Sequence, residues 1–546
     1  MSQMGRGLGV AAALLLATLS CSHKESLDAP PGFRRFIDGL STHHMPISAT
    51  PLAQKYFDQG IRLVYAFNHL EAIRAFEAAQ KLDPDCAMCW WGKALALGPN
   101  INAPMEADAV KPALEAVAEA QKRAPKASQR EQAYVSAIAT RYSDQPGAER
   151  AALDKAYADA MRELAKAYPD DLDAATLFAE SLMDLTPWAY WRKNGDQTEY
   201  TGEIIVQLER VLAANPEHPG ANHYYIHATE ASGQPGKALA SAKRLESLAP
   251  MAGHLVHMPA HTYMRVGLYR DASAANAKGA QADEAYMAWC KSGGFYQQAY
   301  YPHNLHFLWA SETMEGKAEA SLATSKRLAE VVTADAARAA PPAHEIYAIR
   351  YFAPVRFGKW EQILAEPAPP EDLRYATGMY HWARGMALAN TDKLDQAVKE
   401  REALDAVASE DAVKNLAFLE GAASQLLQIA GHLLTAEIAA KQGDTDHAVE
   451  SLESANAAED ALAYTEPPGW PLPVRQYQGA ALLAAGRPAD AEAVYRADLV
   501  EYPENGWSLY GLGASMRAQQ KSADDVDRRF QEAWSGADVK LASSRF

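Results

Sequence analysis

Small and large apolar residues recur along the chain at helical spacings, and the spacings repeat from one segment to another. Between residues 56 and 84 the matched positions are separated by 3, 9, 4, 3 and 5 residues, and the same separations return between residues 477 and 503. These positions are Gly60, Leu63, Ala72, Phe76, Ala79 and Pro84, then Gly479, Leu482, Ala491, Tyr495, Asp498 and Pro503. Small residues let two antiparallel helices approach, larger ones fill between them, and proline ends the second helix. The pattern therefore predicts helical hairpins.

Parts of this pattern recur along the chain, and a turn glycine follows six of the first helices. These glycines are Gly233, Gly267, Gly316, Gly358, Gly443 and Gly486. The signature resembles the tetratricopeptide repeat (TPR), whose period is about 34 residues and whose helix pairs stack as a solenoid. The resemblance implies an all-α fold, a right-handed superhelix of antiparallel helix pairs. It also implies that first helices line a concave groove, which binds a protein or peptide.

About twelve helix pairs are expected between residues 53 and 535. We divide them into N-terminal pairs (53–216), central histidine-rich pairs (217–335) and C-terminal pairs (336–535), preceded by a linker (22–52) and followed by a tail (536–546). Three long segments interrupt the period, at residues 98–108, 186–200 and 283–302, and residues 365–373 cut one helix short. Long loops in a solenoid usually lie on one face and often carry function. The third segment is expected either to cover the groove as a lid or to pack as a loop.

The N-terminus is typical of a secretory signal. Arg6 precedes an apolar run from Leu8 to Leu16, and small residues end at Cys21. This arrangement resembles a bacterial lipoprotein signal over residues 1–21, in which Cys21 would be lipidated. Ordinary secretory cleavage nearby is the alternative. Either predicts an exported protein, in the periplasm or at the outer membrane, that contacts a membrane only through a lipid anchor. No later segment has the eighteen or so apolar residues of a membrane span.

The charge balance excludes one large class of partners. The chain has 52 Lys and Arg against 69 Asp and Glu, a formal net charge of −17. Nucleic acids bind proteins through clustered cations that replace counterions. We therefore expect no nucleic-acid partner.

The turn glycines also bring histidines into register. Ten residues before Gly233, Gly267 and Gly316 stand His223, His257 and His306. Residues three, four or seven apart share one face of a helix. Three faces are therefore predicted: His223, His227 and Glu230; His254, His257 and His261; His303 and His306. Pro259 interrupts the second face, because proline breaks or kinks a helix. If that helix begins near Met258, His254 and His257 lie in the preceding loop.

Histidines on neighbouring first helices can converge on one ion, because stacked helices lie about 10 Å apart. Imidazole suits copper, iron and zinc, and Glu230 could complete a ligand set. The sequence thus predicts a scaffold whose groove carries a transition-metal site, made by His223, His227, Glu230, His257, His261, His303 and His306. One alternative is a metal-dependent enzyme with an open coordination position. Another is a metal-free peptide-binding groove whose histidines are satisfied by hydrogen bonds.

Cys86 and Cys89 form a separate CxxC pair. Such a pair could bind Cu(I), share a zinc ion with other ligands, or form a disulfide. Trp90 follows the second cysteine, where a haem-attachment motif needs histidine. The pair lies several helix pairs before the histidines, so it is treated as a possible second thiol site.

Overall fold

The protein is all-α in a computed structural model that describes residues 33, 35–145, 148–290, 295–419 and 421–546. The signal segment and Cys21 lie outside these residues. The described helices form twelve successive pairs, as the repeat predicts. The first helices are α1 (Pro51–Tyr65), α3 (Ala87–Ala96), α5 (Gln129–Ala139), α7 (Leu172–Met183), α9 (Pro219–Glu230), α11 with α12 (Gly253–His257 and Pro259–Arg265), α14 (Phe295–Met314), α17 (Pro341–Arg356), α19 (Arg374–Ala389), α22 (Ala423–Gln442), α24 (Val474–Ala484) and α26 (Gly506–Ala518).

Each first helix is followed by an antiparallel partner that packs against it. The second helices are α2 (His69–Leu82), α4 (Val110–Arg123), α6 (Arg150–Ala167), α8 (Thr201–Ala214), α10 (Leu239–Leu248), α13 (Tyr269–Cys290), α15 (Ala318–Val331), α18 (Trp360–Ala365), α20 (Leu394–Ala408), α23 (Thr445–Ala461), α25 (Pro488–Glu501) and α27 (Asp524–Ala533). Short helices α16 (Ala334–Ala339) and α21 (Asp411–Lys414) and three 3₁₀ turns, at Ala107–Ala109, Ala124–Lys126 and Pro235–Ala238, complete the described elements.

The repeated sequence pattern corresponds to a repeated packing unit. Phe76 of α2 fills the space between α1 and α3, where a Cβ atom on Gly60 or Gly92 would lie 2.5 or 2.4 Å from its ring. Tyr495 of α25 fills the equivalent space between α24 and α26, opposite Gly479 and Gly511. Small residues are thus required wherever a large ring of the second helix enters between two first helices. This is the TPR-like arrangement that the spacing predicts.

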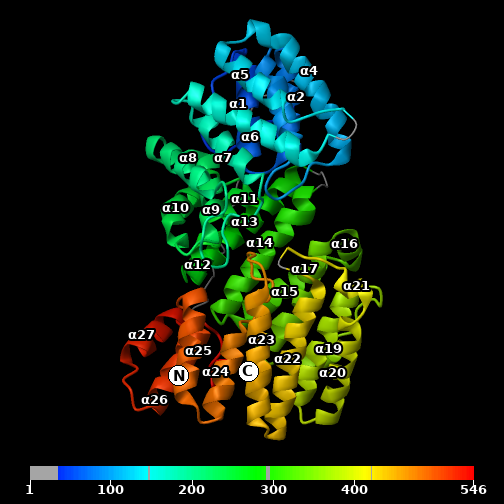
Figure 1. Ribbon diagram of the computed structural model, residues 1–546, viewed down its shortest axis with the longest axis vertical. Coiled ribbons are helices and arrows are strands. Elements are labelled where there is room, and N and C mark those ends of the chain that lie inside the picture. Colours follow the sequence, from blue (N-terminus) through cyan, green and yellow to red (C-terminus); the bar gives the residue numbers. More distant parts are fainter. Residues whose placement is uncertain (1–32, 34, 146–147, 291–294, 420) are drawn as a thin grey trace, which may run out of the picture.

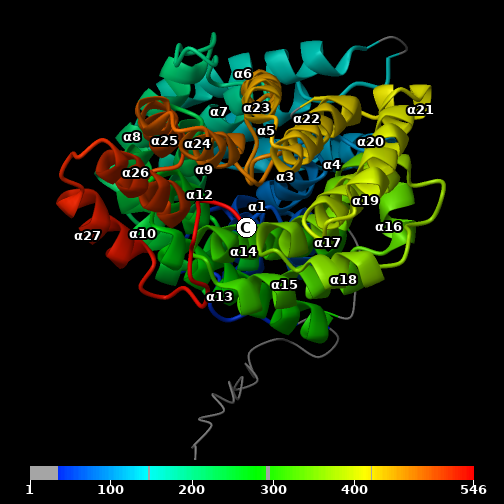
Figure 2. The same cartoon turned by 90° about the horizontal axis from the view of Figure 1, so that it is seen from below.

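The first helix pairs follow one another down the long axis of the molecule, whereas the C-terminal pairs lie side by side across its lower half (Figure 1). Helices α1–α8 form one end, α9–α14 lie in the middle, and α17–α27 form the other end. Seen from below, the C-terminal pairs follow an arc from α17 to α27, and the C-terminus lies inside this arc (Figure 2). The array is therefore curved, and the C-terminus lies inside the curve formed by the C-terminal helix pairs.

The two terminal segments, which the sequence analysis describes as a linker and a tail, pack against the helices. In the N-terminal segment, Leu40 and Met45 are buried, and the Ser48 backbone donates to Glu131 of α5. In the C-terminal segment, the Ser544 hydroxyl donates to the carbonyl of Gln476, 2.6 Å away, and Asp538 accepts from the backbone of Ala318. Both segments thus tie together helix pairs that are distant in sequence.

Distant pairs also touch directly. In the C-terminal half, Trp507 of α26 donates to the carbonyl of Thr313 in α14 at 3.1 Å, and Tyr269 of α13 donates to the carbonyl of Pro503 at 2.9 Å. In the N-terminal half, the ring of Tyr65 packs on Gly220 of α9. An open solenoid has contacts only between neighbouring repeats. In this protein, contacts between distant helix pairs close the array. They lie near α9, α11, α12 and α14, the helices that carry the histidines.

Candidate metal centre

Six histidines converge inside the middle of the molecule. They fall into two groups whose ligand atoms lie within 4.8 Å of one another. We call His223, His227 and His254 the first triad, and His257, His261 and His303 the second triad. The structure thus brings together most of the histidines singled out by the sequence register. His306 belongs to neither triad, because its ring lies beside Trp309, with the ring centres 5.9 Å apart.

Pro259 does not separate the histidines as anticipated. Helix α11 ends at His257 and α12 begins at Pro259, but Met258 between them has helical backbone angles, φ −50° and ψ −34°. Proline is tolerated here because it occupies the first position of α12, where an N–H has no helical partner. The helical path therefore continues, so that His257 and His261 remain neighbours and His254 enters the first triad.

The cluster is covered, not displayed on an open groove. All the triad histidines except half-buried His303 are at most 2% exposed. Phe67, Trp188 and Tyr300 contact rings of the first triad, and Phe307 contacts all three rings of the second. The interior position overturns the expectation that these side chains face the solvent of a concave groove. A bound peptide could not reach them in this structure.

The three segments that interrupt the repeat supply part of this cover. Trp188, in the 186–200 segment, packs edge-on against His227 and donates to the carbonyl of Ile101 in the 98–108 segment. The 283–302 segment is neither a lid nor a loop in its described part. It lengthens α13 and begins α14, and its Tyr296 hydroxyl accepts from the backbone N–H of His254.

Hydrogen bonds fix the tautomers of the first triad. His223 Nδ1 lies 2.7 Å from the carbonyl oxygen of Tyr65, and His227 Nδ1 lies 2.8 Å from Glu230 Oε1. Both partners only accept, so each Nδ1 must carry its proton and each neutral ring presents an Nε2 lone pair. His223 Nε2 lies 3.1 Å from His254 Nε2, whereas His227 Nε2 and His254 Nδ1 are buried without a hydrogen-bond partner.

The second triad is arranged similarly, but only the tautomer of His261 is fixed, because Asn276 can donate as well as accept. His257 Nδ1 lies 2.7 Å from Asn276 Oδ1, and His261 Nδ1 lies 2.5 Å from Glu230 Oε2. Their Nε2 atoms approach to 2.9 Å. In metal sites, a ligating histidine characteristically donates its other N–H to a carboxylate or carbonyl group. Both triads therefore have the outer hydrogen bonds that orient imidazole ligands.

The sequence predicts Glu230 as a metal ligand, but in the structure both of its carboxylate oxygens are used in hydrogen bonds to histidines. Its two oxygens accept from His227 and His261, one from each triad. Burial raises the pKa of Glu230, but His261 and the hydrogen bonds from both histidines outweigh burial and lower it to about 2. The ionised carboxylate is thus occupied in orienting two rings.

The imidazoles are in the form that binds metals. Burial, together with the neighbouring histidines, holds the pKa values of His223, His254, His257 and His303 well below the usual value. Burial also lowers the pKa of His227, against the opposite effect of Glu230. A neutral imidazole has a free lone pair at neutral pH, as metal binding requires.

The distances suit a transition metal. Two nitrogens bound to one tetrahedral ion at about 2.0–2.1 Å lie roughly 3.3 Å apart. The two close Nε2 pairs, at 3.1 and 2.9 Å, are near that separation. Without an ion, His227 Nε2 remains a buried polar atom without a partner, which costs about 1–3 kcal/mol. The donor set therefore fits copper, zinc or iron.

The cysteine pair is a disulfide. Cys86 and Cys89 are bonded to each other, and both are at most 1% exposed. Cys86 caps α3, where its sulfur accepts from the backbone of Cys89. As a disulfide, the pair has no thiolate to bind Cu(I) or zinc. Of the alternatives given for this motif, the structure therefore contains the disulfide.

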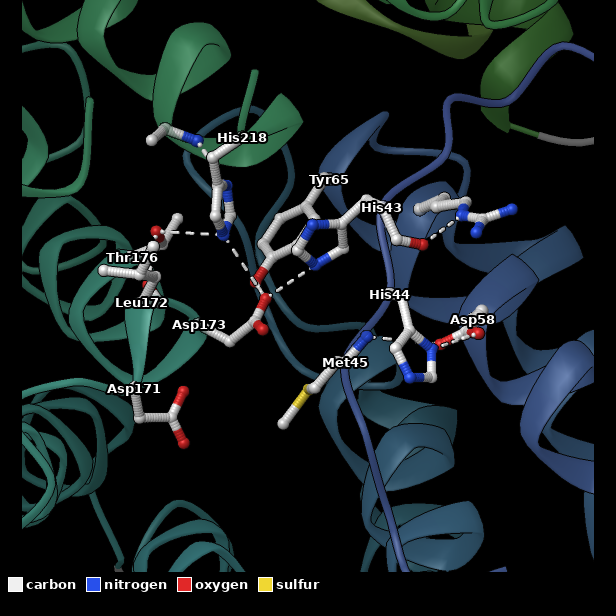
Figure 3. A network of polar contacts seen from close by, with 12 residues as sticks. His43, His44, Met45, Asp58, Tyr65, Asp171, Leu172, Asp173, Thr176 and His218 are labelled. Atoms are coloured by element: carbon white, nitrogen blue, oxygen red, sulfur yellow. Dashed lines mark hydrogen bonds and ion pairs between the residues drawn. The ribbon is translucent and has the colours of Figure 1, made fainter. Parts of the chain in front are cut away.

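A second polar network was missed by the sequence register. His43, Tyr65 and His218 all approach one oxygen of Asp173, with distances to Oδ1 of 2.8, 2.7 and 3.3 Å (Figure 3). His43 comes from the N-terminal segment, Asp173 from α7, and His218 from the position just before α9. No shared spacing from a turn glycine connects them, so only the folded chain brings them together.

This network fits hydrogen bonding better than metal binding, although its three ionisable groups are close enough to hold an ion. His218 Nδ1 accepts from the backbone N–H of Ala221 at the start of α9, so the ring proton is on Nε2 and points to Asp173. Burial raises the pKa of Asp173, but His43 and His218 lower it well below its usual range. The carboxylate is thus ionised, and its Oδ1 already faces three polar hydrogens.

Known proteins resemble this chain only distantly. No protein-family model and no curated protein matches it. Among solved structures, the human IFIT1 dimer with m7Gppp-AAAA is 11% identical, with a TM-score of 0.30, over 87% of this chain and 88% of that one. The P58(IPK) TPR domain is 12% identical, with a TM-score of 0.21, over 86% of this chain and 98% of that one. Naa15/Naa10 bound to HypK-THB gives 14% identity, a TM-score of 0.23, and coverage of 88% and 70%.

None of the described helices combines the length and the apolar character needed to cross a membrane.

Proposed function

We propose that this chain is an exported TPR-type scaffold whose buried histidine cluster binds a transition metal. The observation that supports it most strongly is the fixed tautomer of His223, His227 and His261. Each donates its Nδ1–H to an acceptor-only group and directs a lone pair on Nε2 toward other imidazoles. Copper, zinc and iron are the metals that such a nitrogen-rich set suits. The proposed export rests on residues 1–21, with Cys21 as the lipidation site.

Elemental analysis of protein purified without a histidine tag tests this function. About one or two equivalents of copper, zinc or iron, retained after dialysis, are expected. Less than about 0.1 equivalent, with none retained after incubation with each metal, would contradict it. Replacing His306 by alanine provides a matched control, because it removes a half-buried imidazole on α14 that lies outside both triads.

A metal-dependent enzyme is the second candidate. Each triad offers three imidazoles, and a metal with three protein ligands keeps a position for water or substrate. The aromatic cover restricts that position to a molecule of a few atoms. A protein or peptide partner would bind elsewhere on the solenoid surface, because the cluster is buried. Turnover of small substrates by the metal-loaded protein, lost in a triad variant, is the expected sign of an enzyme.

A further inference from the structure

The histidines form two sets of three that are linked through a single side chain. The rings of His227 and His261, one from each triad, lie with centres 5.3 Å apart and project from different helices, α9 and α12. Glu230 is on α9, three residues after His227, and receives both Nδ1–H groups. The carboxylate is 1% exposed, so water does not compete for its oxygens.

The positions of the ligand nitrogens favour two metal centres over a single one. In the first triad the Nε2 atoms of His223 and His254 face each other, and in the second those of His257 and His261 do so. Each close pair is completed by a third imidazole within 4.8 Å, from His227 or from His303. No group of neighbouring ligand atoms among the described residues mixes His223 or His254 with His257 or His303. One further group, His227, Glu230 and His261, joins a ring of each triad, but there Glu230 accepts from Nδ1 of both rings. The Nε2 atoms of the two triads are thus left for two separate points.

We propose that the cluster holds two transition-metal ions, each bound by one triad, and that Glu230 couples them by orienting one ligand of each. This proposal rests on the proposed function. Each ion would have three protein ligands and one further position, open to a ligand of a few atoms such as water or a diatomic molecule. Glu230 is a positioning residue, because it touches the ligating rings and neither ion.

The role of Glu230 depends on its having two acceptor oxygens. A carboxylate keeps the protons of His227 and His261 on Nδ1, and thereby leaves both Nε2 atoms free to bind metal. A glutamine has one acceptor oxygen and one NH₂ group. That NH₂ group would donate to Nδ1 of one histidine and so shift the proton of that ring to Nε2. Glu230→Gln is therefore expected to impair one centre strongly and to leave the other nearly intact.

The first experiment counts the ions by titrating the metal-free full-length protein with Zn²⁺ in a calorimeter. Two equivalents are expected for the native chain and for the control His306→Ala. His254→Ala, in the first triad, and His303→Ala, in the second, should each bind one. Circular dichroism and thermal melting confirm that each variant is folded.

One equivalent in the native chain, lost in both variants, would overturn the two-centre proposal and leave the proposed function standing. No binding in the native chain would overturn both.

The second experiment tests the coupling. Glu230→Gln should weaken one of the two Zn²⁺ sites by about 10–100-fold, the usual effect of losing an outer hydrogen bond to a ligand. A merely structural role would alter the melting temperature and leave both affinities unchanged. Two sites of native affinity in a folded Glu230→Gln protein would therefore refute the role assigned to Glu230.

Discussion

His257 Nε2 lies 2.9 Å from His261 Nε2 inside the protein, although each ring already uses its Nδ1 in another hydrogen bond. Glu230 holds the proton of His261 on Nδ1, so that one lone pair is fixed. If Asn276 presents its oxygen to His257, the second Nε2 is also a lone pair, and the two repel each other unless a cation lies between them. If the Asn276 amide is reversed and instead presents its NH₂ group, it donates to His257 Nδ1. His257 then carries its proton on Nε2 and donates it to His261 Nε2, so no ion is needed.

These two alternatives make opposite predictions about stability. A metal that binds only the folded state raises the free energy of unfolding by about 2.7 kcal/mol when its concentration is 100 times its dissociation constant. We therefore expect a chelator to lower the midpoint of thermal unfolding, and added metal to restore it. The melting curve followed by circular dichroism measures this. A chelated, metal-free protein with an unchanged midpoint would favour the reversed amide.

His218 tests the assignment of the Asp173 network to hydrogen bonding. Asparagine in its place can still accept from the backbone of Ala221 as a helix cap, but is too short to reach Asp173. His218→Asn is expected to lower the free energy of unfolding by about 1–3 kcal/mol, because a buried carboxylate loses a donor. The metal content should not change.

The control for this variant is His44→Ala, which removes the partly exposed contact of His44 with Asp58. Exposed pairs of this kind contribute about 1 kcal/mol or less. Loss of one metal equivalent in His218→Asn, with both triads intact, would instead identify the network as a third metal site.

Asp283 is expected to make stability depend on pH. Its side chain is fully buried, and burial raises its pKa to about 7, despite hydrogen bonds from Tyr296 and Asn304. The unfolded chain releases this proton near pH 4, whereas the folded chain keeps it until about pH 7. The folded state therefore binds more protons in this window, and its contribution to stability is lost as pH rises from about 4 to 7. The loss is on the order of a few kcal/mol.

The variant Asp283→Asn removes this titration. Its amide can be accommodated, because Asn304 Oδ1 is buried without a partner and can accept after that side chain turns. We expect the free energy of unfolding of the variant to fall less steeply between pH 4 and 7 than that of the native chain. Asp271→Asn, on the exposed face of the same helix, should keep the native slope. Equal slopes in all three proteins would show that Asp283 ionises normally.

The repeat and most of the candidate site were predictable for different physical reasons. The solenoid is built from local spacing, so Gly60, Phe76 and the turn glycines identified the helix pairs directly. His223, His227 and His261 were found because equivalent helices place equivalent positions on one face. His303 rather than His306 faces the cluster, because the exact rotation of α14 depends on packing against Phe307 and Trp309.

Other features depend on contacts between parts of the chain that are far apart in sequence. Neither the dual acceptor role of Glu230 nor the path through Met258 and Pro259 can be derived from helical spacing. The burial of the cluster results from the closing contacts of Tyr65, the N-terminal segment and the long loops. His43 illustrates the limit most clearly, since it lies 130 residues from its partner Asp173.

The turn at Gly267 tests whether the array closes on itself. Gly267 has a φ of +79°, and a Cβ atom there would lie 2.4 Å from the carbonyl oxygen of Pro503, between α25 and α26. Gly443 has a similar φ of +83°, but nothing lies within 4 Å of its added Cβ. An L-residue in this backbone conformation costs about 1–2 kcal/mol. We therefore expect Gly443→Ala to show that loss alone.

Gly267→Ala should lose about 1–3 kcal/mol more than Gly443→Ala, because the extra methyl group is forced against backbone that cannot easily move. Thermal unfolding midpoints of the two variants, measured side by side, give this difference. The turn at Gly267 connects α12, which carries His261, to α13, so the larger loss would show that the C-terminal pairs press against the helices of the cluster. Equal losses would mean that Pro503 does not contact this turn in solution and that the array is more open than this structure.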